Sequence, residues 1–234
     1  MLILAFETSA KAGSVALWRD GVLLGESYQN TGLTHSQTVM AMAEKLIAHC
    51  GYTPAEVEAV AVAAGPGSFT GVRIGVAAAK GFAWGKELPC CGVSTLEAMA
   101  VNLGAWNGYV VPVMDARRSQ VYTATFLAQE GRLTRICEDR AISLQELGEE
   151  LKEVTQPVFL VGDGAGLCYR TLQETVKQLV LPPEHRMHQR AAGVAIVAAQ
   201  KIAAGETCDA AALEPNYLRL SQAERERLEK MHNA

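Results

Sequence analysis

A pattern of strand-like segments occurs twice in this chain, and it limits the possible folds more than any other feature. An apolar run, LILAFE, ends on Glu7, and two further β-prone runs follow it and meet at an Asp20-Gly21 turn. The same order returns with YVVPVMD, which ends on Asp115, and with two runs that meet at Glu130-Gly131. Few residues are identical between the copies, so the shared order is the evidence for a duplication. It predicts an α/β protein with two related lobes, each opening with a β-β-β meander.

Segments typical of helices and buried strands follow each meander. Capping sequences of the form Ser/Thr-x-x-Glu start at Thr53, Ser94, Ser143 and Ser221, and each predicts the start of a helix. The runs VEAVAVAAG and PVFLVGDG are typical of buried strands. Strands that alternate with helices place parallel pairs beside each meander. Further helices are predicted at residues 33–50, 68–84, 166–179 and 191–205.

The duplication also predicts how the chain divides. We expect an N-terminal lobe at residues 1–106, a C-terminal lobe at 107–220 and a charged tail helix at 221–234. The sequence leaves open whether the helix from Ala191 packs on the first lobe or on the second.

Composition excludes several classes of protein. Hydrophobic residues make up 49% and charged residues 20% of the chain, which is typical of a globular protein. The net charge of -4 gives no overall attraction to nucleic acid. No run approaches the roughly 20 apolar residues of a membrane span, and Glu7 interrupts the apolar N-terminus where a secretory signal would continue. Six cysteines without a C-x-x-C pair are typical of reduced thiols, so we expect a cytoplasmic protein.

A glycine-rich segment, residues 65–75, joins a predicted strand to a predicted helix. Such a turn can offer backbone N–H groups to a phosphate, but Val72 and Arg73 stand where a Walker loop needs Lys and Ser/Thr. The alternative is a tight turn with close helix packing. The Gly162-Asp163-Gly164 segment leaves the same two alternatives open: approach to a nucleotide, or a plain strand-to-helix turn.

Metal and nucleophile signals are weak. Glu7 and Asp115 could hold a metal-bound nucleotide between the lobes, or each could accept hydrogen bonds from its own turn. His185 and His188 have H-x-x-H spacing in a polar loop with no acidic or Cys ligand beside them, so we expect no metal. Ser68 lacks the G-x-S-x-G pattern of a nucleophile elbow.

The helices at 33–50 and 68–85 are apolar over more than one stripe. In the second, small residues recur every four positions at Gly71, Gly75 and Ala79, and the charged residues are Arg73 and Lys80. Either the helices are buried inside the monomer or they meet another subunit. The small size of one lobe favours the second alternative. The predicted partner interface consists of His35, Val39, Met40, Met42, Leu46, Gly71, Val72, Arg73, Gly75, Val76, Ala79 and Lys80.

Six segments together resemble the bacterial TsaB (YeaZ) family from Met1 to about Leu220. They are ETS, LTHSQ, GPGSFTGVRIG, STLEA, MDARRSQVY and EPNYLR, and GPGSFTGVRIG is the most specific. The resemblance implies the actin/sugar-kinase/Hsp70 (ASKHA) fold. It also implies a non-catalytic subunit in tRNA threonylcarbamoyladenosine synthesis.

In such a complex the homologous TsaD subunit transfers threonylcarbamoyl to N6 of the adenosine beside the anticodon of tRNAs that read A-starting codons. The ATPase TsaE joins the two. The resemblance implies pairing with TsaD through the helices at 33–50 and 68–85. Because the apolar faces of these helices need to be covered, we also expect a homodimer through the same helices when the chain is alone. The resemblance implies no intrinsic cofactor, ATP or ADP at the interface of the complex, and tRNA contact that is indirect or weak.

Two departures from the wider family matter. The catalytic homologue carries an H-x-x-x-H metal site where residues 94–102 of this chain contain no His, and Gln37 stands where Glu is usual. Both argue against a metal or carboxylate role here. A stand-alone small-molecule kinase of the same fold is the alternative function, and a glycoprotease-like enzyme is a third.

Overall fold

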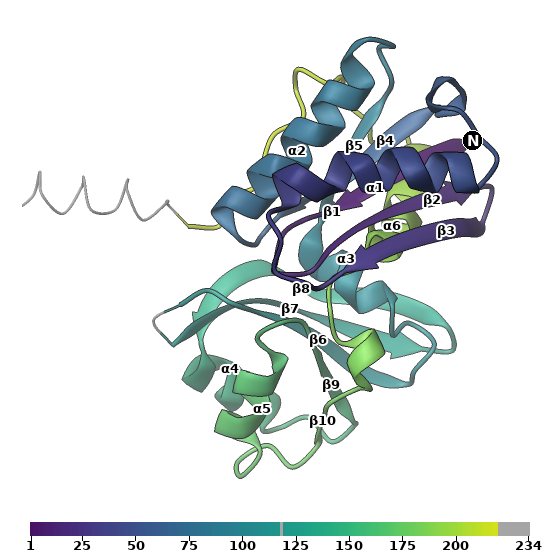
Figure 1. The fold of residues 1–234 in the computed structure, drawn as a ribbon. Helices are drawn as coiled ribbons and strands as arrows, with labels where there is room; N and C mark the ends of the chain where they lie inside the picture. The colour runs from purple at the N-terminus through teal and green to yellow at the C-terminus, as the bar shows by residue number, and fades with distance from the viewer. Residues whose placement is uncertain (118, 220–234) are drawn as a thin grey trace, which may run out of the picture.

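The computed structural model describes residues 1–117 and 119–219, and it places one mixed five-stranded sheet in each of two lobes (Figure 1). The order in the first sheet is β3-β2-β1-β4-β5, and in the second it is β8-β7-β6-β9-β10, so the lobes correspond strand by strand. Glu7 ends β1 and Asp115 ends β6, which confirms the predicted duplication. The strands are β1 (Leu2–Glu7), β2 (Gly13–Arg19), β3 (Val22–Gln29), β4 (Ala59–Gly65), β5 (Cys90–Ser94), β6 (Gly108–Asp115), β7 (Gln120–Gln129), β8 (Arg132–Ser143), β9 (Val158–Val161) and β10 (Leu179–Val180).

Two helices cover the outer face of each sheet. In the first lobe these are α1 (His35–His49), which packs on β2, and α2 (Phe69–Trp84), which packs on β4. In the second they are α4 (Leu144–Leu151) and α5 (Ala165–Leu172). Short 3-10 turns lie at Pro54–Glu56 and Glu184–Arg186. The central strands β1 and β4 are buried along their whole length, as expected of parallel neighbours covered on both faces.

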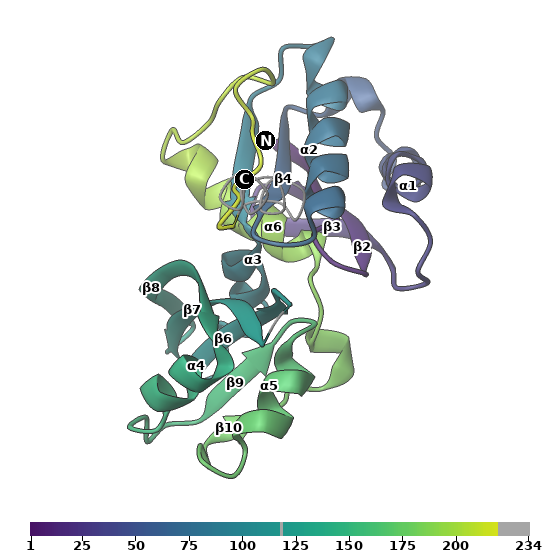
Figure 2. The same cartoon turned by 90° about the vertical axis from the view of Figure 1, so that its left-hand side faces the viewer.

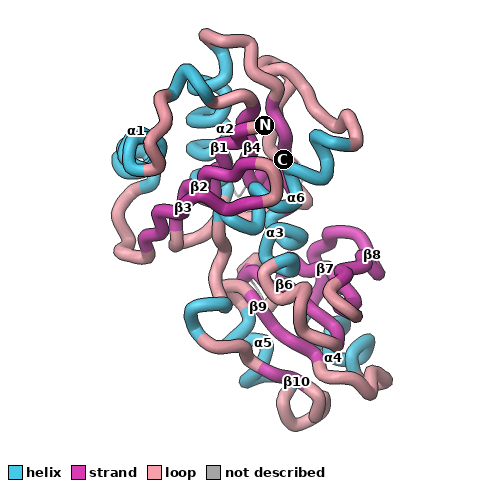
Figure 3. The backbone as a smooth tube through the Cα atoms, turned by 90° about the vertical axis from the view of Figure 1, so that its right-hand side faces the viewer, coloured by secondary structure: helices cyan, strands magenta, loops and turns pink. Residues whose placement is uncertain are grey.

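The remaining helices, α3 (Thr95–Val101) and α6 (Ala191–Ala203), lie between the two sheets (Figure 2, Figure 3). α6 packs on the lobe that it does not follow, and α3 packs on both lobes. α3 follows β5, yet Leu96 and Met99 share a core with Val110 and Phe126 of the second sheet. α6 follows β10, yet it packs on β1, β2, β4 and β5 of the first sheet. The boundary at residue 106 stays a prediction, but the helix from Ala191 lies with the first lobe.

Several predicted element boundaries differ from the structure. The predicted helix at 166–179 ends at Leu172, because Leu179 instead pairs with Val158 and extends the second sheet as β10. Residues 54–56 form one 3-10 turn rather than a longer helix, although the capping box from Thr53 is formed as predicted. The predicted helix at 221–234 lies outside the described residues. Within 1–117 and 119–219, no helix combines the length and apolar character needed to cross a bilayer.

Candidate partner surface and interlobe cleft

The predicted row of small residues on α2 faces inward rather than toward a partner. A Cβ added to Gly71 would collide with the backbone oxygen of Thr8, and one added to Gly75 would collide with the Thr8 hydroxyl. Ala79 is fully buried. The row therefore lets α2 lie close against the end of β1 in its own lobe.

Most of the predicted interface is interior for the same reason. The first lobe is thick enough to bury one face of α1 and of α2, so burial inside the monomer is the correct alternative for these side chains. The residues that the structure moves from the predicted interface to the core are Val39, Met42, Leu46, Gly71, Val72, Gly75, Val76 and Ala79.

The outer faces of α1 and α2 carry a second set of small and apolar residues. Ala77, Gly81 and Gly85 are exposed at intervals of four, and a Cβ at Gly81 or Gly85 would meet no atom within 4 Å. Trp84 is 65% exposed and Met40 is 43% exposed. We call this set the α1–α2 outer face, and each of its members is exposed to solvent in the part of the chain that the structure describes.

His35 at the start of α1 has a structural role. Its Nε2 lies 2.7 Å from the carbonyl oxygen of Ala10, and its ring occupies the space where Gly13 has no side chain. The side chain is half-buried, so it fixes α1 to the turn between β1 and β2.

Arg73 and Lys80 are engaged by the chain's own C-terminal segment. This segment, residues 206–219, follows α6 and is called the strap below. Lys80 donates to the carbonyl oxygens of Ala211 at 3.0 Å and Leu213 at 3.1 Å, and Arg73 Nε donates to the Tyr217 hydroxyl at 2.7 Å. Both charged residues of the predicted interface therefore bind the chain itself. The EPNYLR motif marked this segment, but its spacing carries no information about what it contacts.

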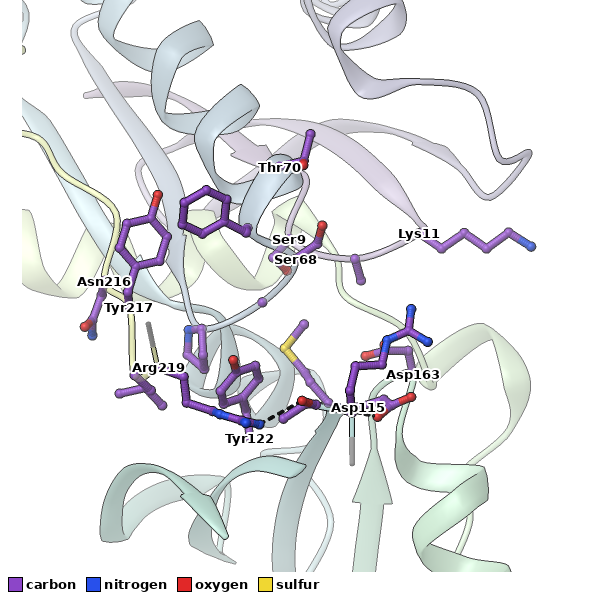
Figure 4. A pocket seen from close by; sticks show the side chains of 18 residues that line it. Ser9, Lys11, Ser68, Thr70, Asp115, Tyr122, Asp163, Asn216, Tyr217 and Arg219 are labelled. Carbon is purple, nitrogen blue, oxygen red and sulfur yellow. Dashed lines mark hydrogen bonds between the residues drawn. The ribbon is translucent and has the colours of Figure 1, made fainter. Parts of the chain in front are cut away.

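A cavity of about 580 Å³ lies between the lobes (Figure 4). Its walls come from the turn after β1, the start of α2, the end of β6 and the strap. Its polar lining residues include Ser9, Lys11, Ser68, Thr70, Asp115, Arg117, Asp163, Asn216, Tyr217 and Arg219.

The predicted acidic pair does not come together in this cavity. Asp115 lines it, but its Oδ1 accepts a hydrogen bond from the Arg117 N–H at 2.7 Å, so it caps its own turn. Glu7 is fully buried, and its Oε1 accepts from the Ser9 N–H at 2.6 Å. Burial raises the Glu7 pKa to about 7, and the like charge of Asp163 adds to this rise. The turn-bonded alternative thus accounts for both Glu7 and Asp115.

Asp163 is the acidic residue that sequence analysis left without a role. It lines the cavity, and Gln189 donates to its Oδ1 at 2.9 Å. The surrounding protein desolvates the carboxylate, and this raises its pKa. Its place between Gly162 and Gly164 was the signal that could have identified it.

Close packing also explains the glycines proposed for phosphate or nucleotide contact. Gly65 has φ +123°, and a Cβ there would collide with the Asn216 carbonyl oxygen. A Cβ at Gly162 would collide with the Val113 carbonyl oxygen, and one at Gly164 would lie 3.0 Å from the Asp115 nitrogen. The plain-turn alternative is therefore sufficient at all three positions.

The described residues contain no group of three or more His, Cys, Asp or Glu side chains placed to hold a metal ion. His188 instead lies 2.8 Å from a Glu184 carboxylate oxygen. All six cysteines are free, and burial raises the pKa of Cys168 to about 12.

Comparisons with known proteins identify the family. Residues 29–227 match the family model described as "TsaD: tRNA N6-adenosine threonylcarbamoyltransferase". The chain is 34% identical to the tRNA threonylcarbamoyladenosine biosynthesis protein TsaB of Bacillus subtilis, over 96% of each chain. It is 35% identical to TsaB of Escherichia coli, over 94% of this chain and 95% of the other. The chain belongs to the TsaB family.

Solved structures agree with this TsaB assignment. A Pseudomonas aeruginosa protein described as similar to the peptidase YeaZ has a TM-score of 0.76 and 27% identity, and it covers 93% of this chain and 99% of its own. More distant structures with TM-scores of 0.50 to 0.52 and identities of 11 to 15% share the fold alone. The two-lobed architecture is the actin/sugar-kinase/Hsp70 fold that the resemblance implied.

Proposed function

We propose that this TsaB-family chain is a non-catalytic subunit of the complex that makes threonylcarbamoyladenosine in tRNA. It takes part in that biosynthesis by pairing with a catalytic TsaD subunit that places threonylcarbamoyl on N6 of the adenosine beside the anticodon. The α1–α2 outer face is the proposed docking surface. TsaE joins the pair, and tRNA contact by this chain is indirect or weak. ATP or ADP binds at the interface of the complex, and the cytoplasmic location stays a prediction.

The α1–α2 outer face is the observation that carries this proposal. Ala77, Gly81 and Gly85 leave a smooth strip along α2, and the exposed Trp84 ring stands beside it. Small residues let a partner helix approach closely, and an exposed Trp is typical of an interface anchor. The match of this chain to a TsaD family model makes TsaD a homologue, so a homologous pair of helices is the natural occupant. Without TsaD, a second copy of this chain would cover the same face and form a two-fold dimer.

A charge placed on the outer face tests the proposal. Ala77→Glu and Gly81→Glu should weaken co-purification with TsaD and reduce tRNA modification in a reconstituted assay by at least about tenfold, because an unpaired carboxylate would be desolvated against the partner helix. Both positions are exposed, so the fold should remain. Val76→Glu and Ala79→Glu, the substitutions suggested by the sequence, would place the charge in the core and are unsuitable.

Ala203→Glu is the matched control, because Ala203 is an exposed helical alanine on α6, away from the outer face. It should bind TsaD and support modification as the wild type does. Wild-type pairing and wild-type modification by both outer-face variants would show that the interface lies elsewhere.

A further inference from the structure

The strap runs through the gap between the two lobes. Asn216 and Leu218 line the cavity of about 580 Å³ described above, and they also line a second cavity of about 540 Å³. The second cavity is bounded on its far side by Glu97 of α3 and Arg135 of β8. The strap therefore divides one interlobe cleft into two parts.

Residues 211–217 of the strap are fixed to the first lobe by contacts with α2 and with the end of β4. Lys80 holds two strap carbonyls, and the Asn216 N–H donates to the Ala64 carbonyl oxygen at 2.7 Å. The Tyr217 ring stacks on Phe69 with centroids 4.8 Å apart. Arg73 completes this contact, since its guanidinium lies 3.8 Å from the centre of the Phe69 ring while its Nε binds the Tyr217 hydroxyl. All of these contacts lie on α2 or at the end of β4.

The strap then reaches the second lobe. Arg219 Nη1 donates to the Ala116 carbonyl oxygen at 2.9 Å, and Figure 4 marks this hydrogen bond of Arg219 with a dashed line beside Tyr122. Ala116 belongs to the turn between β6 and β7, where the Ala116 N–H also donates to the Gln120 carbonyl oxygen. One short segment thus connects α2 to a turn of the other sheet.

Most side chains of the strap are exposed or half-buried. Among strap residues that the structure describes, Ala210 and Leu213 are the buried hydrophobic ones, and Tyr217 is 41% exposed. Behind the second cavity, Arg135 of β8 forms an ion pair with Glu97 of α3 at 2.8 Å, and Asp139 on the same strand forms a second ion pair with Arg135 at 2.7 Å. Segments with few buried contacts open locally before the whole fold unfolds, so the strap contacts should be lost first. The Arg135–Glu97 ion pair would then still hold the lobes together on that side.

We propose that the strap is a latch that holds the interlobe cleft closed by joining α2 to the β6–β7 turn. When Tyr217 and Arg219 release, the lobes separate about the contacts of α3 with the second sheet. The latch sits on the inner end of α2, so it is distinct from the outer face proposed for TsaD.

Hydrogen–deuterium exchange of the full chain tests the latch. Tyr217→Ala removes contacts with the first lobe, and Arg219→Gln removes the bond to Ala116. Each should speed exchange of the Ala116 and Gln120 amides by about five- to tenfold and raise the radius of gyration in small-angle X-ray scattering. The effect of Tyr217→Ala is the decisive one, because its stacking and hydrogen-bond partners, Phe69 and Arg73, both lie in the first lobe.

Tyr52→Ala is the matched control. Tyr52 accepts a hydrogen bond from Arg19 at 2.9 Å, and the Arg19 guanidinium lies over its ring, as at Tyr217, but the pair lies far from the cleft. It should leave Ala116 and Gln120 at wild-type rates. The latch is ruled out if Tyr217→Ala and Arg219→Gln speed exchange within the strap while the β6–β7 turn and the radius of gyration stay unchanged. If Tyr217→Ala lowers the overall stability of the fold, the exchange rates and the radius of gyration of Arg219→Gln alone test the latch.

Discussion

At the scale of single residues, two glycines on α2 have opposite environments. Gly71 faces the Thr8 backbone, and Gly81 faces solvent. Gly71→Ala should lower the free energy of unfolding by about 1–3 kcal/mol, because the backbone must move to admit the methyl group. Gly81→Ala should raise it by up to about 1 kcal/mol, because alanine favours the helix. Urea denaturation of the pair provides the measurement, and equal effects would contradict the assignment of the inner and outer faces.

Glu7 makes the stability depend on pH. Its pKa is raised to about 7 in the fold and is about 4.5 in the unfolded chain, so the folded protein binds more protons between these values. Stability should therefore fall as pH rises from about 4.5 to 7 and then level off, with a total loss of about 3 kcal/mol. Glu7→Gln should remove this dependence: it should match the wild type near pH 4 and be more stable at pH 8.

Urea denaturation at several pH values would measure the Glu7 effect. Glu44→Gln, on the exposed side of α1, is the control and should follow the wild-type curve. A Glu7→Gln variant that is less stable than the wild type at pH 8 would show that the ionised carboxylate is stabilised in the fold.

At the scale of elements, the crossing of α3 and α6 ties the lobes together. Each helix fills the core of the sheet that it does not follow, and they meet where Gly193 of α6 lies against the Ala98 carbonyl oxygen of α3. Neither sheet can keep its core if this crossing opens. The two lobes should therefore unfold together despite their duplicated topology.

Gly193→Ala should lower the free energy of unfolding by about 1–3 kcal/mol, because the new methyl group would meet backbone atoms on the other helix. Gly148→Ala on α4 is the control, since its nearest neighbour is the flexible end of Leu172 and the cost should be smaller. Thermal unfolding followed by circular dichroism would compare them. A larger loss in Gly148→Ala would contradict the importance of the crossing.

At the scale of the whole molecule, turn hydrogen bonds and close packing account for the acidic residues at the interlobe cleft. Asp115 accepts a hydrogen bond from its own turn, Glu7 is buried beneath Ser9, and the strap occupies the middle of the cleft. The isolated chain should hydrolyse ATP no faster than a buffer control and should modify no tRNA alone. Phosphate release would measure this. Turnover that survives repurification and disappears in Asp115→Asn would favour the kinase alternative.

Local sequence patterns predicted much of this fold. The two meanders, the equivalent ends at Glu7 and Asp115, and the capping boxes at Thr53 and Ser143 are encoded by near neighbours, so they could be recognised before the structure. At Ser94 the pattern predicted the helix start, but the Glu97 carboxylate pairs with Arg135 of the other lobe instead of completing the box. Motif spacing also indicated the TsaB family, since the motifs span most of the chain.

Tertiary structure alone decided which surfaces meet. Periodicity places Gly71, Gly75 and Ala79 on one face of α2 and Ala77, Gly81 and Gly85 on another, but it does not tell which face the sheet covers. In the same way, the apolar pattern of α6 predicts that the helix is buried but does not tell which sheet covers it. The charges of Arg73 and Lys80 predict hydrogen-bond partners but do not tell that these partners lie in the strap. These choices depend on contacts between segments that are distant in the chain, 63 positions for Thr8 and Gly71 and 131 positions for Lys80 and Ala211, which local spacing does not encode.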